Sequence, residues 1–253
     1  MHVDMNKIVL YYHKLSSPEF FYRFASAVLP WLILPCVALF AIGLYTGLVL
    51  SPPDYQQGDT VRIMYIHVPA AWMSMFIYVV MAISGVLAVV WHTKIAEWTT
   101  MACAPVGAMF TAITLVTGSL WGRPTWGTYW AWDARLTAEL VLLFLYLGVI
   151  ALYHAINDSR QAARAASLLA IVGLINIPII HFSVKWWNTL HQGASIRLTG
   201  ESSIHESMLW PLLIMAVAAK LYFLISLFNR IRVQILQAES GKAWVQALER
   251  RHV

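Results

Sequence analysis

One short stretch of the chain combines residue types that could bind a large, flat, partly anionic molecule. The segment WGRPTWGTYWAWDARLT, residues 121–137, holds four of the twelve tryptophans, two glycines, a proline, one carboxylate and two arginines. Tryptophans offer broad apolar faces, arginines pair with carboxylates, and glycines let the backbone approach a ligand closely. We therefore expect this segment to form a loop that covers such a ligand.

Charged residues near the loop have two possible roles. Because arginine binds carboxylates in a bidentate manner, Arg62, Arg123, Arg135 or Lys185 could receive acidic groups of the ligand. Asp133 could orient a histidine or an indole N–H group. Alternatively, these charges pair with one another or with neighbouring groups and only fix the loop.

Histidines supply candidate metal ligands. Of the nine histidines, His67, His181, His191 and His205 fall near the same side of the chain's predicted layout. His67 and His191 each neighbour tryptophan and a cation, so we favour these two as ligands of a metal centre. We expect His181 to form a hydrogen bond inside the helix bundle and His205 to be a solvated loop residue.

Composition indicates the elements that position these residues. Hydrophobic residues make up 60% of the chain and charged residues 11%, whereas soluble domains carry about 25% charged residues. Six apolar runs are each near the ~20 residues that a membrane-spanning helix needs. We predict an all-α, polytopic membrane protein that forms a single domain, residues 1–253. The predicted spans are residues 29–50, 68–91, 99–120, 138–156, 167–184 and 207–229.

The distribution of Lys and Arg predicts the orientation. With both termini cytoplasmic, the inward loops and tails carry eleven of these residues and the outward loops carry five, as the positive-inside rule requires. The Trp-rich loop, residues 121–137 between the third and fourth spans, then faces outward. An interfacial aromatic belt accounts for the tryptophans at span ends and is the alternative explanation for the loop, although four tryptophans in one loop are more than anchoring requires. The outward five are Arg62, Arg123, Arg135, Lys185 and Arg197.

Three features of the chain exclude a cleaved signal peptide and some kinds of chemistry. The first 28 residues are polar, aromatic and basic, and the apolar run after them is too long for a cleaved signal peptide. Cys36 and Cys103 lie in apolar runs without a paired-thiol or Cys-x-x-Cys-His motif, so cysteine redox chemistry is not expected. A nucleotide-binding glycine loop and a nucleophile–base pair are absent from the sequence, so we do not expect an enzyme.

The segment WGRPTWGTYWAWDARLT resembles the WWD signature of the haem-handling family of cytochrome c maturation proteins. Over nearly all of its length the chain resembles the CcmC branch of that family, through its six spans, through His67, and through the run NIPIIHFSVKWWNTLHQG that contains His191. At Tyr129 we expect tryptophan in close relatives. An aromatic side chain replaces another there, so stacking on haem is retained.

The resemblance implies a haem carrier at the periplasmic face of the bacterial inner membrane. It implies non-covalent haem b whose iron has His67 and His191 as axial ligands, with ATP hydrolysis in a partner subunit. The implied partners are the haem chaperone CcmE, the ABC-type ATPase CcmA, the membrane subunit CcmB and the small helper CcmD. The other residues implied at the site are Trp121, Trp126, Trp130, Trp132, Asp133, Arg62, Arg123 and Arg135.

Two alternative functions stay open. A permease subunit of an ABC-type transporter, moving haem or another solute, needs polar residues along its spans, and we identify only Asn176, His181 and Lys220 there. A haem- or quinone-linked oxidoreductase needs a second redox centre. His67 and His92 are 25 residues apart, which is about 38 Å of helix and too long for two mid-membrane haems.

Overall fold

The computed structural model describes residues 16–191 and 204–250, which fold into helices and short connections. Six helical segments are long and apolar enough to cross a membrane, so the predicted all-α, six-span architecture is confirmed. The helices are α2 (Pro18–Tyr45), the π-helical η1 (Thr46–Leu50), the 3₁₀-helical η2 (Asp59–Ile63), α3 (Met64–Trp91), α4 (Lys94–Trp126), α5 (Ala134–Ala155), α6 (Ser159–Gly173), α7 (Asn176–Trp186), α8 (Glu206–Ala238) and α9 (Ala243–Glu249).

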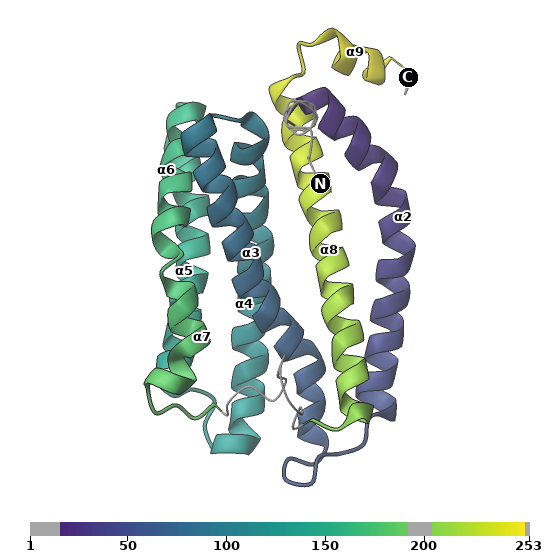
Figure 1. Ribbon diagram of the computed structural model, residues 1–253, viewed down its shortest axis with the longest axis vertical. Helices are drawn as coiled ribbons and strands as arrows, with labels where there is room; N and C mark the ends of the chain where they lie inside the picture. The colour runs from purple at the N-terminus through teal and green to yellow at the C-terminus, as the bar shows by residue number, and fades with distance from the viewer. Residues whose placement is uncertain (1–15, 192–203, 251–253) are drawn as a thin grey trace, which may run out of the picture.

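The helices form two groups that meet along α8 (Figure 1). In the first, α3 and α5 each pack on α4 and on α6, and α7 packs on α5. In the second, α2 packs chiefly on α8, which also contacts α3 and α4. We call the end that carries Gly127–Asp133, at the bottom of Figure 1, the tryptophan-rich end. The start of α2 and the short helix α9 both lie at the opposite end.

The predicted loop 121–137 is wrong in its extent, because most of it is helical. α4 continues through Trp126, and α5 begins at Ala134, so only Gly127–Asp133 is non-helical. Gly122 and Pro124 are typical of loops, but in a membrane a helix satisfies the backbone polar groups that a loop would leave open. α4 ends where Gly127 takes a left-handed conformation, φ 81°, and its N–H donates to the Arg123 carbonyl oxygen at 3.1 Å.

Other span boundaries also extend beyond the apolar runs. The second span begins with η2 rather than at residue 68, and Pro69 lies inside α3. The fifth span is broken between α6 and α7 at Leu174 and Ile175. The break precedes Pro178, which lacks an N–H to donate to the Leu174 carbonyl and whose ring crowds that position.

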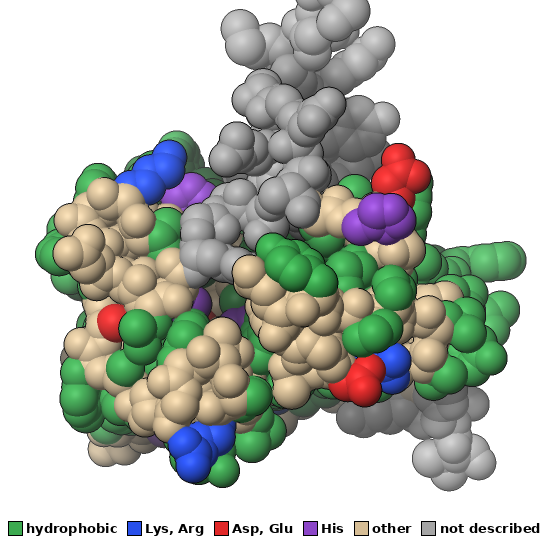
Figure 2. Space-filling model, turned by 90° about the horizontal axis from the view of Figure 1, so that it is seen from below, with side chains coloured by type: hydrophobic (Ala, Val, Ile, Leu, Met, Phe, Trp, Pro, Cys, Tyr) green, Lys and Arg blue, Asp and Glu red, His purple; other side chains and the backbone are tan. Residues whose placement is uncertain are grey.

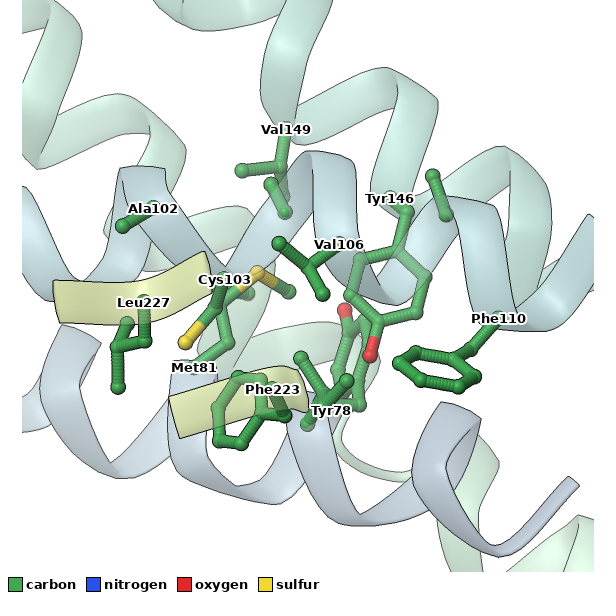
Figure 3. Close-up of a cluster of buried hydrophobic side chains, with 14 of the residues drawn as sticks. Tyr78, Met81, Ala102, Cys103, Val106, Phe110, Tyr146, Val149, Phe223 and Leu227 are labelled. Carbon is green, nitrogen blue, oxygen red and sulfur yellow. The ribbon is translucent and has the colours of Figure 1, made fainter. Parts of the chain in front are cut away.

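The core holds the helices at close range (Figure 3). Small residues of α4, among them Ala102, Cys103 and Gly107, let its neighbours approach the backbone. The ring of the fully buried Tyr146 occupies the space that a side chain at Gly107 would need. The Tyr146 hydroxyl crosses to α3 and donates to the Ser74 carbonyl oxygen at 2.7 Å. This packing sets the spacing of the helices that carry the candidate site.

Candidate functional site

The tryptophan-rich end collects the predicted site residues from separate segments. His67 lies near the start of α3, Trp121 and Trp126 lie in the last turns of α4, and His191 follows α7. The segment Gly127–Asp133 lies between α4 and α5. Seen from this end, histidine side chains and a few charged groups lie among apolar and uncharged ones (Figure 2).

The imidazole ring of His67 packs against α4. Its Nδ1 atom lies 3.0 Å from the Thr117 hydroxyl oxygen, and its ring meets that of Trp121 edge to face, with 5.6 Å between centroids. A side chain at Gly118 would put its Cβ 3.0 Å from His67 Cε1, so the glycine lets the imidazole approach the α4 backbone.

The hydrogen bonds of Thr117 decide the tautomer of His67. The Thr117 hydroxyl has a single proton, and it donates to the Ile113 carbonyl oxygen at 2.6 Å. The Thr117 oxygen therefore accepts a hydrogen bond from the Nδ1–H group of His67. The Nε2 atom of His67 is then unprotonated and keeps its lone pair for a metal.

His191 is held by a carboxylate. Its Nδ1 atom lies 3.3 Å from Asp133 Oδ2, and the same oxygen accepts the Leu190 backbone N–H at 3.2 Å. The Trp126 ring meets the imidazole at a steep angle, with 4.8 Å between centroids. A carboxylate can only accept, so His191 donates through Nδ1–H and its Nε2 atom also keeps a lone pair. Sequence reasoning expected Asp133 to orient a histidine or an indole, and the structure places it on His191.

Electrostatics keep His191 in its neutral form near pH 7. Burial lowers the pKa of the His191 imidazole and the nearby Arg135 charge lowers it further, whereas Asp133 acts in the opposite direction. Arg135 therefore lies near His191 at the tryptophan-rich end, to which α3 also brings His67. Only the neutral imidazole can ligate a metal.

The other aromatic residues of the segment 121–137 differ in environment. Trp121 donates its indole N–H to the Gln57 side-chain oxygen at 2.7 Å. Trp130 packs edge to face on the exposed Trp132, with 5.4 Å between centroids. The Trp130 indole nitrogen is buried, and it has no hydrogen-bond partner among the described residues. A buried donor without a partner is rare, so a bound acceptor at this position would be stabilised.

The three candidate arginines also differ. Arg62 donates to the carbonyl oxygens of Leu48 and Ser51 at 2.7 and 3.3 Å and pairs with Asp59 at 3.1 Å, so it fixes the connection that precedes α3. Arg123 is exposed, donates to the Gly127 carbonyl oxygen and lies over the Tyr129 ring.

Arg135 is half-buried and, within residues 16–191 and 204–250, makes no hydrogen bond through its guanidinium. Its charge acts on His191, and the Asp133 and Glu139 carboxylates act on it in turn. Of the three arginines, it is the one whose N–H groups are available to an acidic ligand beside His191.

Several other predicted residues lie apart from the site. The prediction that His181 forms a hydrogen bond inside the bundle is wrong: it is exposed on α7 and meets the ring of Phe182 edge to face. It faces outward because Ile180 and Ser183 take the buried side of this short helix. His205 caps the start of α8, and Lys185 lies over the Phe182 ring. Arg197 lies outside the described residues.

A shallow groove of about 330 Å³ opens beside the site, between α5 and α7. It brings the exposed rings of Trp132 and Trp187 next to apolar and small residues of the two helices. Asp133 separates this groove from His191. The groove is lined by Trp132, Asp133, Ala134, Thr137, Ala138, Val141, Asn176, Ile179 and Trp187.

Comparison with known proteins identifies the family of this chain. The family model described as Heme exporter protein C matches residues 11–246. The Heme exporter protein C of Bradyrhizobium diazoefficiens is 53% identical over 223 residues, which cover 88% of this chain and 84% of that protein. This chain belongs to the Heme exporter protein C family.

Further members of the family extend over similar lengths. The Heme exporter protein C of Escherichia coli strain K12 is 48% identical over 236 residues, 93% of this chain and 95% of that protein. A putative cytochrome c biosynthesis ccmC-like mitochondrial protein of Marchantia polymorpha is 45% identical over 221 residues, 86% of this chain and 91% of that protein. Family membership and six spans together make the chain a multi-pass membrane protein.

Sequence reasoning missed three residues that hold site residues in place. Thr117 and Gly118 hold His67, and Gln57 holds Trp121. Threonine, glycine and glutamine at span ends carry no signal of their own, so only the folded contacts reveal them. Glu139, a buried carboxyl group on α5, was also missed, although it is the only carboxylate in the six predicted apolar runs.

The donor set fits a centre that needs two protein ligands. Among the described residues, no group of three or more His, Cys, Asp or Glu side chains could hold a metal ion. A bare zinc ion in a structural site takes four protein ligands, whereas haem already supplies four nitrogens and needs only axial ligands. Two imidazoles with free Nε2 atoms, His67 and His191, match the second case.

Proposed function

We propose that this protein carries haem b at the tryptophan-rich end and hands it to a haem chaperone during cytochrome c maturation. Its relatives are named Heme exporter protein C, which indicates haem as the cargo. In this proposal His67 and His191 are the axial ligands of the haem iron. The protein acts as one integral-membrane domain and does not itself catalyse a reaction.

The observation that carries the proposal is the matched state of the two histidines. Each donates through Nδ1–H to a fixed oxygen, of Thr117 or of Asp133, and each is left with a free Nε2 atom. Such outer partners fix the tautomer and raise the basicity of a ligating imidazole. Two histidine ligands fill both axial positions of haem iron, which favours carriage over oxygen activation.

The surrounding groups suit the rest of the haem molecule. The rings of Trp126 and Trp121 lie against the two histidines and offer apolar area to a porphyrin. We propose that the Arg135 guanidinium and the Trp130 indole N–H bind the haem propionates. The Trp130 N–H is buried without a hydrogen-bond partner in the described part of the chain, and Arg135 has only the charges of Asp133 and Glu139 near it. Trp132, on the rim, is exposed enough to contact an arriving protein.

Arg62 and Arg123 have a different place in the proposal. Their guanidinium groups already hold backbone carbonyl oxygens of the connecting segments. We propose that they shape the rim of the haem site and that their remaining N–H groups contact the cargo only at its edge.

The proposal includes an orientation and partners. The excess of Lys and Arg on the opposite loops supports cytoplasmic termini, which would put the tryptophan-rich end in the periplasm of a bacterial inner membrane. CcmE would then take up the haem there. CcmA would hydrolyse ATP, and CcmB and CcmD would complete the membrane assembly. The cytochrome c biosynthesis name of the Marchantia relative supports this pathway.

The alternative is a permease subunit that moves haem or another solute through the bundle. Its centre argues against a polar path, because Tyr78, Met81, Cys103 and Tyr146 fill the space between α3, α4 and α5. Haem reaching the site from the outer side of the membrane would not need such a path.

The test is the absorption spectrum of the purified protein in detergent, oxidised and then reduced with dithionite. We expect a low-spin b-type spectrum that is lost or becomes high-spin in both H67A and H191A. H181A and H205A are matched controls, because these histidines are exposed and lie apart from the site. A spectrum that is unchanged in H67A and H191A, or haem that never binds after reconstitution, would overturn the ligand assignment.

A second measurement tests handover. Haem-loaded protein is mixed with purified CcmE, and covalent haem on the chaperone is followed by its resistance to denaturing electrophoresis. We expect transfer from the wild type and none from H67A or H191A. Transfer of free haem at the same rate without this protein would contradict a carrier role.

A further inference from the structure

Glu139 is a buried carboxyl group within the membrane-spanning part of the bundle. It is the only Asp or Glu in the six predicted apolar runs, and it is 6% exposed in the second turn of α5. Burying a carboxyl group costs free energy unless its hydrogen bonds are satisfied, so ionisable groups at this depth are rare and usually functional. Glu139 therefore needs an explanation beyond packing.

The partner of Glu139 lies on a helix that does not pack beside α5. The Ser74 Oγ atom of α3 lies 2.7 Å from Glu139 Oε1 and 2.8 Å from the Ala71 carbonyl oxygen. Its single proton goes to one of these two oxygens, and when it goes to Ala71 the protonated Glu139 carboxyl donates to Oγ instead, so the bond between the two side chains forms in either case. Within the described residues, α3 and α5 are diagonal to each other, since each packs on α4 and α6 but they do not form a side-by-side pair. The hydrogen bond thus reaches across the centre of the bundle.

A second hydrogen bond joins Ser74 of α3 to a residue two turns further along α5. The Tyr146 hydroxyl of α5 donates to the Ser74 backbone oxygen at 2.7 Å, so Ser74 receives contacts from two turns of α5. On the other side of α5, the Asn176 amide donates to the Ala138 carbonyl oxygen at 2.9 Å. Position 74 of α3 and positions 138–146 of α5 are therefore fixed by directional bonds as well as by packing.

These bonds align the two halves of the site. His67 and Ser74 are seven residues apart on α3, so they lie on one face, separated by two turns or about 10 Å. Asp133, which holds His191, is the N-cap of α5, and Glu139 follows in the second turn of that helix. A shift of α3 along α5 would change the separation of His67 and His191 directly.

We propose that Glu139 and Ser74 form a register lock between α3 and α5 that sets the separation of the two histidines for haem. Glu139 is a positioning residue that acts through Ser74 and does not contact the haem. The proposal rests on the proposed haem site for its functional meaning. The lock itself is a property of the protein without haem.

The first experiment compares four variants by haem titration and absorption spectroscopy. E139L and S74A remove the hydrogen bond, whereas E139Q and S74T keep a group able to form it. We expect E139L and S74A to raise the haem Kd about tenfold or more and to convert low-spin haem to a high-spin or mixed form. We expect E139Q and S74T to keep the wild-type spectrum with a Kd within about threefold.

The pattern among the variants decides the outcome. Low-spin spectra and unchanged affinity in both E139L and S74A would overturn the lock. Failure of E139Q to the same degree as E139L would also overturn it, because charge rather than the hydrogen bond would then be required. Partial recovery of the low-spin spectrum of E139L by added imidazole would support a misplaced ligand.

The second experiment does not use haem. Spin labels at I66C on α3 and V141C on α5, both exposed positions, report the distance between the two helices in the haem-free protein. The native Cys36 and Cys103 are buried and stay unlabelled. We expect a narrow distance distribution in the wild type, E139Q and S74T, and a broadened or shifted one in E139L and S74A. Identical distributions overturn the lock, and lack of haem binding by the wild type overturns only the proposed function.

Discussion

Asp133 and His191 are 58 residues apart in the chain, yet the Asp133 Oδ2 atom lies 3.3 Å from the Nδ1 atom of His191. The other oxygen of the same carboxylate accepts the Leu136 backbone N–H at 2.8 Å and caps the start of α5. One side chain therefore sets both where α5 begins and how the imidazole is turned. The position of this histidine is tied to the helix bundle through a side chain that is only 8% exposed.

The first prediction concerns Asp133. D133A removes the cap and the histidine partner together, so we expect it to cost about 1 kcal/mol of stability and to increase the high-spin fraction of bound haem. D133N keeps the capping group but loses the charge, so we expect near-normal thermal stability with a weaker haem spectrum. Thermal unfolding and absorption spectra measure the two effects separately. Equal spectra for D133A and the wild type would contradict a role for Asp133 in orienting His191.

The second prediction concerns Gly118. A Cβ atom there would lie 3.0 Å from the Cε1 atom of His67, which is closer than most carbon contacts. G118A should therefore push the imidazole away from Thr117 and reduce low-spin haem. S119A, at the next position of α4, is the matched control, and haem titration of the two variants is the measurement. Equal affinity of G118A and S119A for haem would show that His67 does not need this close approach.

The third prediction is the pH dependence of haem binding. Because burial and Arg135 lower the pKa of His191, its neutral form persists below the ordinary histidine pKa of 6.5. The unfolded chain takes up the proton first as the pH falls, so the stability from neutral His191 is present above that pH and is lost on acidification. We expect low-spin haem at pH 6.5 and its loss only at lower pH.

Two variants give the sign of this effect. Arg135 lowers the pKa of His191, so R135Q should move the loss of low-spin haem to higher pH. Asp133 raises it, so D133N should move the loss to lower pH. Spectra recorded between pH 8 and pH 4 on both variants provide the comparison. A shift to lower pH in R135Q, or to higher pH in D133N, would contradict the assignment.

The fourth prediction separates the arginines. If Arg135 binds a propionate, R135Q should weaken haem binding by about tenfold, the usual cost of losing a charged hydrogen bond. The same variant should bind haem dimethyl ester as well as the wild type does, since the ester has no carboxylates. R123Q is the control, because Arg123 holds Gly127 and should affect haem and its ester equally. A loss in R135Q that is the same for both ligands would exclude propionate binding.

The fifth prediction concerns stability. Any side chain at Gly107 would occupy the position of the Tyr146 ring, so G107A should lower the melting temperature or prevent folding. The double variant G107A/Y146L should recover part of that loss, because the smaller side chain leaves room for the new methyl group. Fluorescence-detected size-exclusion chromatography after heating measures both. No recovery in the double variant would mean that the backbone, rather than Tyr146, limits this position.

Much of the fold could be predicted from local composition. Apolar runs identify membrane helices because lipid requires internally satisfied backbone bonds, so all six spans were found. Their ends were harder, since residues such as Glu19 and Arg23 are polar yet continue α2 and pair with each other at 2.8 Å. Trp121–Trp126 was taken for a loop because glycine and proline usually end helices in water.

The site was predictable only in part. Residue types indicated His67, His191 and Asp133, and the fold brought each to the tryptophan-rich end. Their partners come from other helices, and sequence spacing carries no information about contacts across a bundle. Arg62 was a candidate for binding the ligand, but its guanidinium donates to the Leu48 carbonyl oxygen. That oxygen is within reach because η1, the π-helical segment after α2, places it there, and sequence does not predict a π-helix.

The pairing of α2 with α8 joins helices that are far apart in the chain. α2 packs chiefly on α8, so these contacts can form only after Glu206–Ala238 has been synthesised. Only 17% of the most apolar part of the first span is buried within the chain, which leaves most of that surface for lipid or for a partner subunit. The group of α3–α7 can therefore pack without α2, and α2 depends on α8 for its place in the bundle.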